Sequence, residues 1–277
     1  MTMHRFETRQ PVRLLTEIGK GSVKVVAIET TETIVEITGR DADRVSVSQD
    51  GDQIMVIGPR QQDGLFGGDT RLDAIITLPS ASDVAVRTGS GDISVVGSVG
   101  ITHLKSGSGD LVVDTATGAM VLDTGSGDIR VERAGDDVKA RSGSGDVLVV
   151  EAAAVVEVST GSGDVQLGTT HGSTAVKTGS GDIKVGDAGT DVTLKTGSGD
   201  LTIGTARRGR VTVEGATGDA HVGVPSGIAV WTDISTVTGR IHSTLRGAGQ
   251  PADGADHLEI RARMVTGDVI LTEIQGA

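Results

Sequence analysis

Apolar residues recur along the middle of the chain in a pattern that repeats every eighteen residues. When each unit is numbered from its aspartate as position 1, positions 2, 4, 11 and 13 are mostly apolar. Position 2, for example, holds Ile93, Leu111, Ile129, Val147, Val165, Ile183 and Leu201. Apolar residues two apart are typical of strands whose alternate side chains face inward. The pattern therefore predicts two short strands per unit, one over positions 1 to 4 and one over roughly positions 10 to 15.

A polar turn, Gly-Ser-Gly-Asp, precedes the first strand of each of seven consecutive units. Its copies end at Asp92, Asp110, Asp128, Asp146, Asp164, Asp182 and Asp200. A period of this length marks a stacked repeat, because one unit cannot bury its apolar face alone. We therefore expect parallel strands in register, with about 4.8 Å between successive coils.

The residues at position 14 decide between two kinds of coil. They are charged or variable: Lys105, Asp123, Arg141, Ser159, Lys177 and Lys195. Such residues face solvent, and they break the threefold pattern that a left-handed helix of hexapeptides needs. The sequence therefore favours a flattened coil of two sheets and leaves its handedness open. The expected fold class is all-β, a single-stranded parallel β-helix or β-solenoid with irregular β caps.

The regions on either side of the repeat follow the same theme less regularly. Strand-like runs occur at 34–37, 45–47, 54–57 and 72–78, and after Asp200 the spacing of the turns stretches. We expect one continuous domain with three regions. Residues 1–80 form an N-terminal cap with early irregular coils, 81–218 form the regular solenoid, and 219–277 form irregular coils and a cap. Irregular ends protect a solenoid, because an exposed terminal sheet edge templates aggregation.

Composition supports a narrow core. The chain has 42 glycines among 277 residues, and its only aromatic residues are Phe6, Phe66 and Trp231. A core with so little aromatic bulk must be thin and filled by aliphatic side chains and threonine. The chain has no cysteine, which excludes disulfides and cysteine-based metal sites.

Charge and hydropathy limit the kinds of partner and the location that we expect for this chain. The net charge of −12 argues against broad nucleic-acid binding and against docking on anionic lipid. Arg207, Arg208 and Arg210 form a local basic cluster, which we interpret as a solvated loop. The sequence has neither a signal-peptide pattern nor a run of apolar residues long enough to span a membrane. We therefore expect a cytoplasmic protein, with peripheral attachment only through a partner.

Four segments together carry a family resemblance: Phe6 to Val12, Leu72 to Pro79, the Thr-Gly-Ser-Gly-Asp repeats, and Val265 to Leu271. The chain resembles the bacterial β-strand-repeat family of unknown function called "putative adhesin", which is related to the head-GIN and toastrack domains. The likeness covers nearly the whole chain and is closest to actinobacterial members. It implies a parallel β-helix-like stack. Related domains are often attached to membrane segments in envelope-stress systems and are thought to act by protein–protein interaction. The family supplies no catalytic residues.

The column of repeat aspartates is the strongest candidate for a site. Carboxylates stacked at about 4.8 Å repel one another unless a cation or backbone donors compensate. We consider a calcium ladder on Asp92, Asp110, Asp128, Asp146, Asp164, Asp182 and Asp200. The opposing corner of each unit offers no partner carboxylate, however. The favoured interpretation is that each aspartate accepts N–H bonds within its own turn, while the glycines supply positive φ.

Other polar patterns point to structure rather than chemistry. The hydroxyl residues at position 15, from Thr88 to Thr196, share the parity of the buried position 13 and should form an internal hydrogen-bonded ladder. The six histidines, His4, His103, His171, His221, His242 and His257, show no metal-type spacing. Gly-Ser-Gly also differs from the nucleophile elbow, and no helix follows the glycine-rich turns. We therefore expect no enzyme and no cofactor.

Two loops and one tryptophan complete the candidates. Leu65 and Phe66 lie in a glycine-rich loop and are candidate interface residues, and a second loop runs from Gly247 to Asp256. Trp231 is expected to be buried in the C-terminal cap. The sequence favours a non-catalytic scaffold for protein–protein interaction in a regulatory or envelope-stress context. The alternative is a solenoid that binds a ligand or calcium at its Gly-Ser-Gly-Asp turns. The partner and the oligomeric state stay open.

Overall fold

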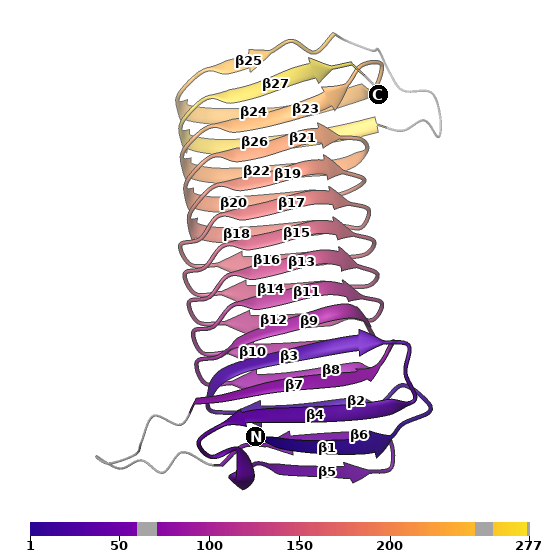
Figure 1. Ribbon diagram of the computed structural model, residues 1–277. Coiled ribbons are helices and arrows are strands. Elements are labelled where there is room, and N and C mark those ends of the chain that lie inside the picture. The colour runs from indigo at the N-terminus through magenta and orange to yellow at the C-terminus, as the bar shows by residue number, and fades with distance from the viewer. Residues whose placement is uncertain (60–70, 247–256, 276–277) are drawn as a thin grey trace, which may run out of the picture. The chain divides into compact units, whose positions relative to one another are not determined.

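The computed structural model describes residues 1–59, 71–246 and 257–275 (Figure 1). The described chain consists of β-strands, loops and one short 3-10 helix, η1 (Ala42–Arg44), which confirms the expected all-β class. Its contacts divide it into two compact units. Unit 1 comprises Met1–Asp136 with Ala140–Ser142, and unit 2 comprises Asp137–Lys139 with Gly143–Ala277. The strand β14 (Val138–Ser142) carries residues of both units.

Unit 1 contains two sheets, here called A1 and B1. Sheet A1 holds, in spatial order, β1 (Thr2–Glu7), β4 (Glu32–Gly39), β7 (Arg71–Pro79), β3 (Lys20–Ile28), β9 (Asp92–Val99), β11 (Leu111–Ala116) and β13 (Ile129–Ala134). Sheet B1 holds β12 (Met120–Thr124), β10 (Thr102–Ser106), β8 (Asp83–Thr88), β2 (Arg13–Ile18), β6 (Gln53–Ile57) and β5 (Ser46–Asp50). Each coil contributes one strand to each sheet.

Unit 2 is built in the same way from sheets A2 and B2. Sheet A2 holds β15 (Val147–Ala152), β17 (Val165–Thr170), β19 (Ile183–Ala188), β21 (Leu201–Ala206), β23 (Ala220–Pro225), β27 (Val269–Ile274) and β25 (Ile241–Ser243). Sheet B2 holds β24 (Ala229–Thr238), β26 (His257–Thr266), β22 (Gly209–Thr217), β20 (Val192–Ser198), β18 (Thr174–Ser180) and β16 (Val156–Thr160).

The eighteen-residue period sets the register of the parallel strands, because residues eighteen positions apart pair with each other. Leu104 pairs with Leu122 between β10 and β12, and Val185 pairs with Ile203 between β19 and β21, both in parallel ladders. These inward-facing residues are almost completely buried. The two strands predicted for each unit, their parallel pairing and the two-sheet coil are therefore confirmed. In the parts of the chain that the structure describes, no helix has the length and apolar character needed to cross a membrane.

A β-bulge in the first regular coil departs from the predicted columns. The parallel register between β11 and β9 shifts after Val113, so Ala116 faces Val99 rather than the small residue Ser98. Gly97, in the bulge, has a φ of +89°, a conformation that favours glycine. Val99 is completely buried and Ser98 is not, so Val99 takes the inward place in this coil.

The first coil of unit 1 does not occupy the end of its stack. The strand β2 pairs in parallel with both β6 and β8, and β3 pairs in parallel with both β7 and β9. The coil that comes first in the chain therefore lies inside, and the later coil β6–β7 lies outside it. Beyond β7, the strands β4 and β1 add in antiparallel fashion, and η1 brings the buried Ala42 and Val45 to the core.

Unit 2 shows the same inversion at its far end. The strand β26 pairs in parallel with β22 on one side and with β24 on the other (Figure 1). In the other sheet, β27 lies between β23 and β25 in the same way. The outer coil β24–β25 therefore comes earlier in the chain than β26 and β27, which lie between it and the strands β22 and β23.

Candidate functional site

The repeat aspartates form hydrogen bonds between coils. In unit 1 the Oδ1 atom of Asp92 accepts the backbone N–H of Asp110 at 3.0 Å, and Asp110 accepts that of Asp128 at 2.9 Å. In unit 2 the chain of acceptors runs from Asp146 through Asp164, Asp182, Asp200 and Asp219 to Asp268. The prediction that each aspartate accepts within its own turn was therefore wrong. The next coil supplies the donor, because identical turns stack directly on one another.

Crowding between stacked turns explains several of the glycines. A Cβ atom at Gly163 would overlap the carbonyl oxygen of Gly145 in the preceding coil. The predicted positive φ is found at Gly181 and Gly199, with values of +144° and +136°. At the equivalent Gly91, Gly109, Gly127 and Gly163 the prediction was wrong, because none of them has such a φ. Among the described residues, no group of three or more histidines, aspartates or glutamates lies close enough to hold a metal ion. The calcium ladder on Asp92, Asp110, Asp128, Asp146, Asp164, Asp182 and Asp200 stays a hypothesis.

The hydroxyl column faces the core, as predicted. Thr160 donates its hydroxyl to the carbonyl oxygen of Gly145 at 3.1 Å and accepts the N–H of Gly163 at 3.2 Å. Thr88 and Ser106 also bond to each other across adjacent coils at 3.0 Å. All members are buried: Thr88, Ser106, Thr124, Ser142, Thr160, Thr178 and Thr196. The column therefore joins successive turns to the core and does not form a binding surface.

The outer face of sheet B2 carries a hollow of about 600 Å³. Its lining includes Lys177, Lys195, Gly197, Glu214, Arg263 and Val265. The hollow forms because Gly197 and the neighbouring Ala216 present little or no side chain to solvent. Glu214 binds Lys195, with 2.6 Å between Oε2 and Nζ. Within the described residues neither Lys177 nor Arg263 has an ion pair, so cationic groups outnumber carboxylates here, in a chain of net charge −12.

Sequence reasoning identified the lysines of this hollow only as solvated residues at position 14. It did not bring them together with Arg263 and Val265, because β26 follows β22 in space but not in the chain. The signal that was available is small: each of Lys177 and Lys195 is followed two residues later by a glycine.

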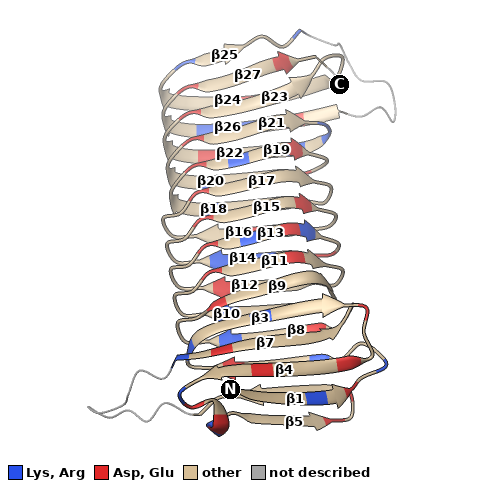
Figure 2. Ribbon diagram, viewed as in Figure 1, with Lys and Arg blue, Asp and Glu red and all other residues tan. Residues whose placement is uncertain are grey.

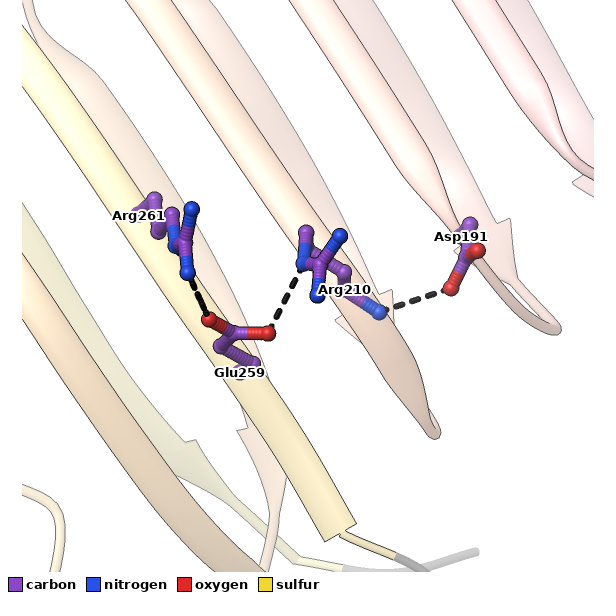
Figure 3. A network of polar contacts seen from close by, with 4 residues as sticks. All are labelled: Asp191, Arg210, Glu259 and Arg261. Carbon is purple, nitrogen blue, oxygen red and sulfur yellow. Dashed lines mark hydrogen bonds and ion pairs between the residues drawn. The ribbon is translucent and has the colours of Figure 1, made fainter.

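Two arginines of the basic cluster at 207–210 are paired with carboxylates. Arg207 forms a two-pronged contact with Asp187, at 2.8 Å from Nε to Oδ1 and 2.6 Å from Nη2 to Oδ2. Arg210 contacts Glu259 at 2.7 Å, and its backbone N–H is donated to Asp191 at 2.8 Å (Figure 3). Arg208 donates its Nε–H to the carbonyl oxygen of Gly189 at 3.3 Å. The cluster therefore makes local contacts, although Arg210 lies on β22 and not in the expected loop. Figure 2 shows acidic and basic residues interspersed along the strands.

Glu259 lies between two arginines. It accepts from Arg210 and, through its other oxygen, from Arg261 at 2.8 Å (Figure 3). The hydrogen bond from Arg210 is the largest influence, and it lowers the pKa of the Glu259 carboxyl below its usual value. The same contact raises the pKa of Arg210. These residues stay charged at neutral pH and tie β22 to β26.

Trp231 is exposed, so the prediction of a buried tryptophan was wrong. It lies on β24, opposite Glu259 of β26, and 68% of its surface is accessible to solvent. Its parity places it on the outer face, and among the described strands β24 has a paired neighbour on one side only. Val237 and Val265 on the same face are 80% and 53% exposed. The other predicted interface residues, Leu65 and Phe66, and the loop from Gly247 to Asp256 lie outside the described residues.

The histidines do not gather into a site in the described chain. His221 contacts Thr272 across β23 and β27, with 2.8 Å between Nε2 and Oγ1. Asp219, two residues before it, is engaged in the aspartate column. Both groups therefore have structural partners.

Comparison with known proteins gives a family. The family model described as "Toastrack DUF4097" matches residues 13–272, which is most of the chain. No curated protein matches it at a significant level.

Solved structures from bacteria resemble the chain at low sequence identity. A protein from Parabacteroides distasonis named "putative lipid binding protein" aligns at 12% identity and a TM-score of 0.52, covering 98% of this chain and 96% of its own. A "putative adhesin" from the same organism aligns at 11% identity and a TM-score of 0.47, with the same coverage. A "putative adhesin" from Bacteroides fragilis aligns at 11% identity and a TM-score of 0.43, again with that coverage. At such identity, the first likeness shows the fold alone.

Proposed function

We propose that this chain, which belongs to the Toastrack DUF4097 family, is a non-catalytic scaffold that binds another protein through the outer face of sheet B2. The observation that carries the proposal is the hollow lined by Lys177, Lys195, Arg263 and Val265. It combines an excess of cationic groups with an exposed apolar side chain on a regular, hydrogen-bonded sheet. Protein interfaces use such a combination of apolar anchors and complementary charge.

The chemistry of the hollow indicates the kind of partner. A segment that presents a carboxylate next to an apolar side chain would pair with Arg263 or Lys177 and cover Val265. The rest of the chain is strongly acidic, so an acidic segment is repelled from most of the surface and attracted to this region. The rigid sheet favours binding, since little side-chain or backbone freedom is lost from the scaffold.

Photo-cross-linking in native cells tests the proposal. A photoreactive phenylalanine analogue at Thr193, on the outer face of β20 next to the hollow, should capture a protein that mass spectrometry identifies. The double variant Lys177→Glu/Arg263→Glu should abolish the cross-link. The double variant Lys105→Glu/Lys184→Glu makes the same change of net charge at exposed lysines elsewhere and should retain it.

Two outcomes contradict the proposal. One is that both double variants cross-link the protein equally, because the hollow then plays no part in recognition. The other is that the purified protein binds anionic vesicles through Lys177 and Arg263, since lipid, which the Parabacteroides protein is named for, would then be the ligand.

A further inference from the structure

The outermost strand of sheet B2 has the properties of an unprotected edge. Strand β24 is ten residues long and pairs with β26 on one side, and no described residue pairs with its other side. Its sequence, Ala-Val-Trp-Thr-Asp-Ile-Ser-Thr-Val-Thr, contains a single charged residue, Asp233. Natural sheets blunt such edges with lysines, prolines, bulges or short strands. Within its bounds β24 has no lysine and no proline, and its register with β26 is continuous, without a bulge.

The outer coil also leaves part of the apolar core open to solvent. Val230 and Ile234 of β24 point inward but are only half-buried, and Ile241 of β25 is 49% exposed. The residues that they pair with in the coil beneath, Leu258, Ala262 and Val269, are completely buried. The described part of the last coil therefore lacks the cover that each earlier coil receives from the next one.

The arrangement of side chains along β24 is self-complementary. Trp231 and Val237, the two large exposed apolar residues of the strand, lie three residues before and three residues after Ile234. If two copies of the strand run antiparallel with Ile234 opposite Ile234, each Trp231 faces the Val237 of the other copy. Asp233 then faces Ser235, so no two charges of like sign are opposed.

Two neighbouring antiparallel registers also keep the outward-facing side chains of both copies on one face of the sheet, but their cross-strand pairs are less favourable. Centring the pair on Asp233 sets two carboxylates opposite each other, and like charges directly opposed across strands are destabilising. Centring it on Ser235 moves Val237 away from Trp231 and sets the tryptophan opposite Gly239. The pattern of one strand thus selects a single antiparallel register with itself.

We propose that β24 is a self-association edge, and that two copies of this chain join through antiparallel β24–β24 pairing about a twofold axis at Ile234. This axis runs perpendicular to the sheet, so it also places β25 of one copy next to β25 of the other. The half-buried residues of the two last coils then cover one another. An isologous interface of this kind closes on itself and stops at a dimer. The inference does not depend on the hollow at Lys177 and Arg263.

Substitutions at Ser235 test the register. In the dimer, Ser235→Asp sets a new carboxylate opposite Asp233 of the other copy, twice per dimer, and should raise the dimer dissociation constant at least tenfold. Ser235→Lys creates two ion pairs there and should lower it severalfold. Within one chain Ser235 faces Arg263, so Ser235→Asp gains a favourable neighbour and Ser235→Lys an unfavourable one. The effects on dimerisation and on folding are therefore opposite in sign.

The measurement is sedimentation over a range of protein concentrations, with the monomer at 28.1 kDa. The parent should approach twice that mass, and Ser159→Asp, the same substitution on the outer face of β16, should behave as the parent. A parent that is monomeric at every concentration overturns the proposal. So does a Ser235→Asp variant that dimerises as well as the parent.

The absence of cysteine allows a second test of the same register. The double variant Trp231→Cys/Val237→Cys should form a covalent dimer on mild oxidation, because each new thiol faces its counterpart across the twofold axis. Either single variant should stay uncrosslinked, since its thiol faces the unchanged residue. Equal cross-linking of a single variant would exclude this register. A photo-cross-linked protein that is a second copy of the chain would count against the proposed scaffold function but not against the dimer.

Discussion

At the residue scale, the buried hydroxyls are expected to contribute to stability. Thr160, for example, hydrogen-bonds to the backbone of its own turn and of the turn in the preceding coil. Thr160→Val keeps the shape of the side chain but leaves the N–H of Gly163 without its hydroxyl acceptor. We expect a loss of about 1–3 kcal/mol in the free energy of unfolding, the usual cost of a buried polar group left unpaired. Thr193→Val, on the outer face of β20, should change it by less than about 0.5 kcal/mol. Urea unfolding of both variants is the measurement, and equal losses would show that the ladder adds no stability.

A second residue-scale prediction concerns pH. Arg210 lowers the pKa of Glu259 in the folded chain. A carboxyl whose folded pKa is depressed contributes stability above its unfolded pKa and loses it as the pH falls through the folded value. Glu259→Gln should therefore unfold at a lower urea concentration than the parent at pH 7. The difference should close as the pH falls below the ordinary range of a glutamate. Salt should also reduce it, because the pair is partly exposed.

The control is Asp233→Asn on the adjacent strand, where no ion pair exists within the described residues. It should unfold like the parent at pH 7. A gap between Glu259→Gln and the parent that is unchanged at low pH would mean that packing, not charge, is responsible.

At the scale of elements, the aspartate column offers a test of the two functional hypotheses drawn from the sequence. One oxygen of each aspartate from Asp146 to Asp219 already accepts an N–H from the following coil, which offsets the repulsion between stacked carboxylates without a cation. We therefore expect millimolar calcium to leave the melting temperature unchanged, with magnesium as the control. A rise specific to calcium would contradict this, since a ligand bound only to the folded chain stabilises it.

The elements also show what the sequence could and could not predict. The strands, their register and the inward hydroxyls follow from the eighteen-residue period, because identical coils repeat the same local contacts. The positions of β2 and β26 do not follow from it. Each pairs with a strand far away in the chain, such as β8 for β2 and β22 for β26, and no local pattern encodes which coil lies outside. Trp231 was expected to be buried because it lies in the C-terminal cap. It is exposed because its strand, β24, is the outermost described strand of sheet B2.

At the scale of the whole molecule, the two inverted ends predict an order of stability that runs against the order of the chain. In unit 2, β26 has paired strands on both sides, and its inward residues Leu258, Ile260 and Ala262 are completely buried. Strand β24 precedes it but pairs, within the described part of the chain, with β26 alone, and its inward residues Val230 and Ile234 are half-buried. In unit 1, β2 is likewise enclosed by β6 and β8. A strand that lies between two coils cannot fray unless the outer coil also separates from it.

Hydrogen exchange followed by mass spectrometry tests this order. Amides of β26 and β2 should exchange slowly, like those of the regular coils, whereas amides of β24 and β25 should exchange earlier, because local opening is easiest where few contacts hold a strand. The comparison should be made on the monomeric Ser235→Asp variant, so that pairing of β24 with a second copy does not protect it. If protection instead declines steadily toward residue 275, the last coil frays from its end. The inserted strand would then not hold the outer coil in place.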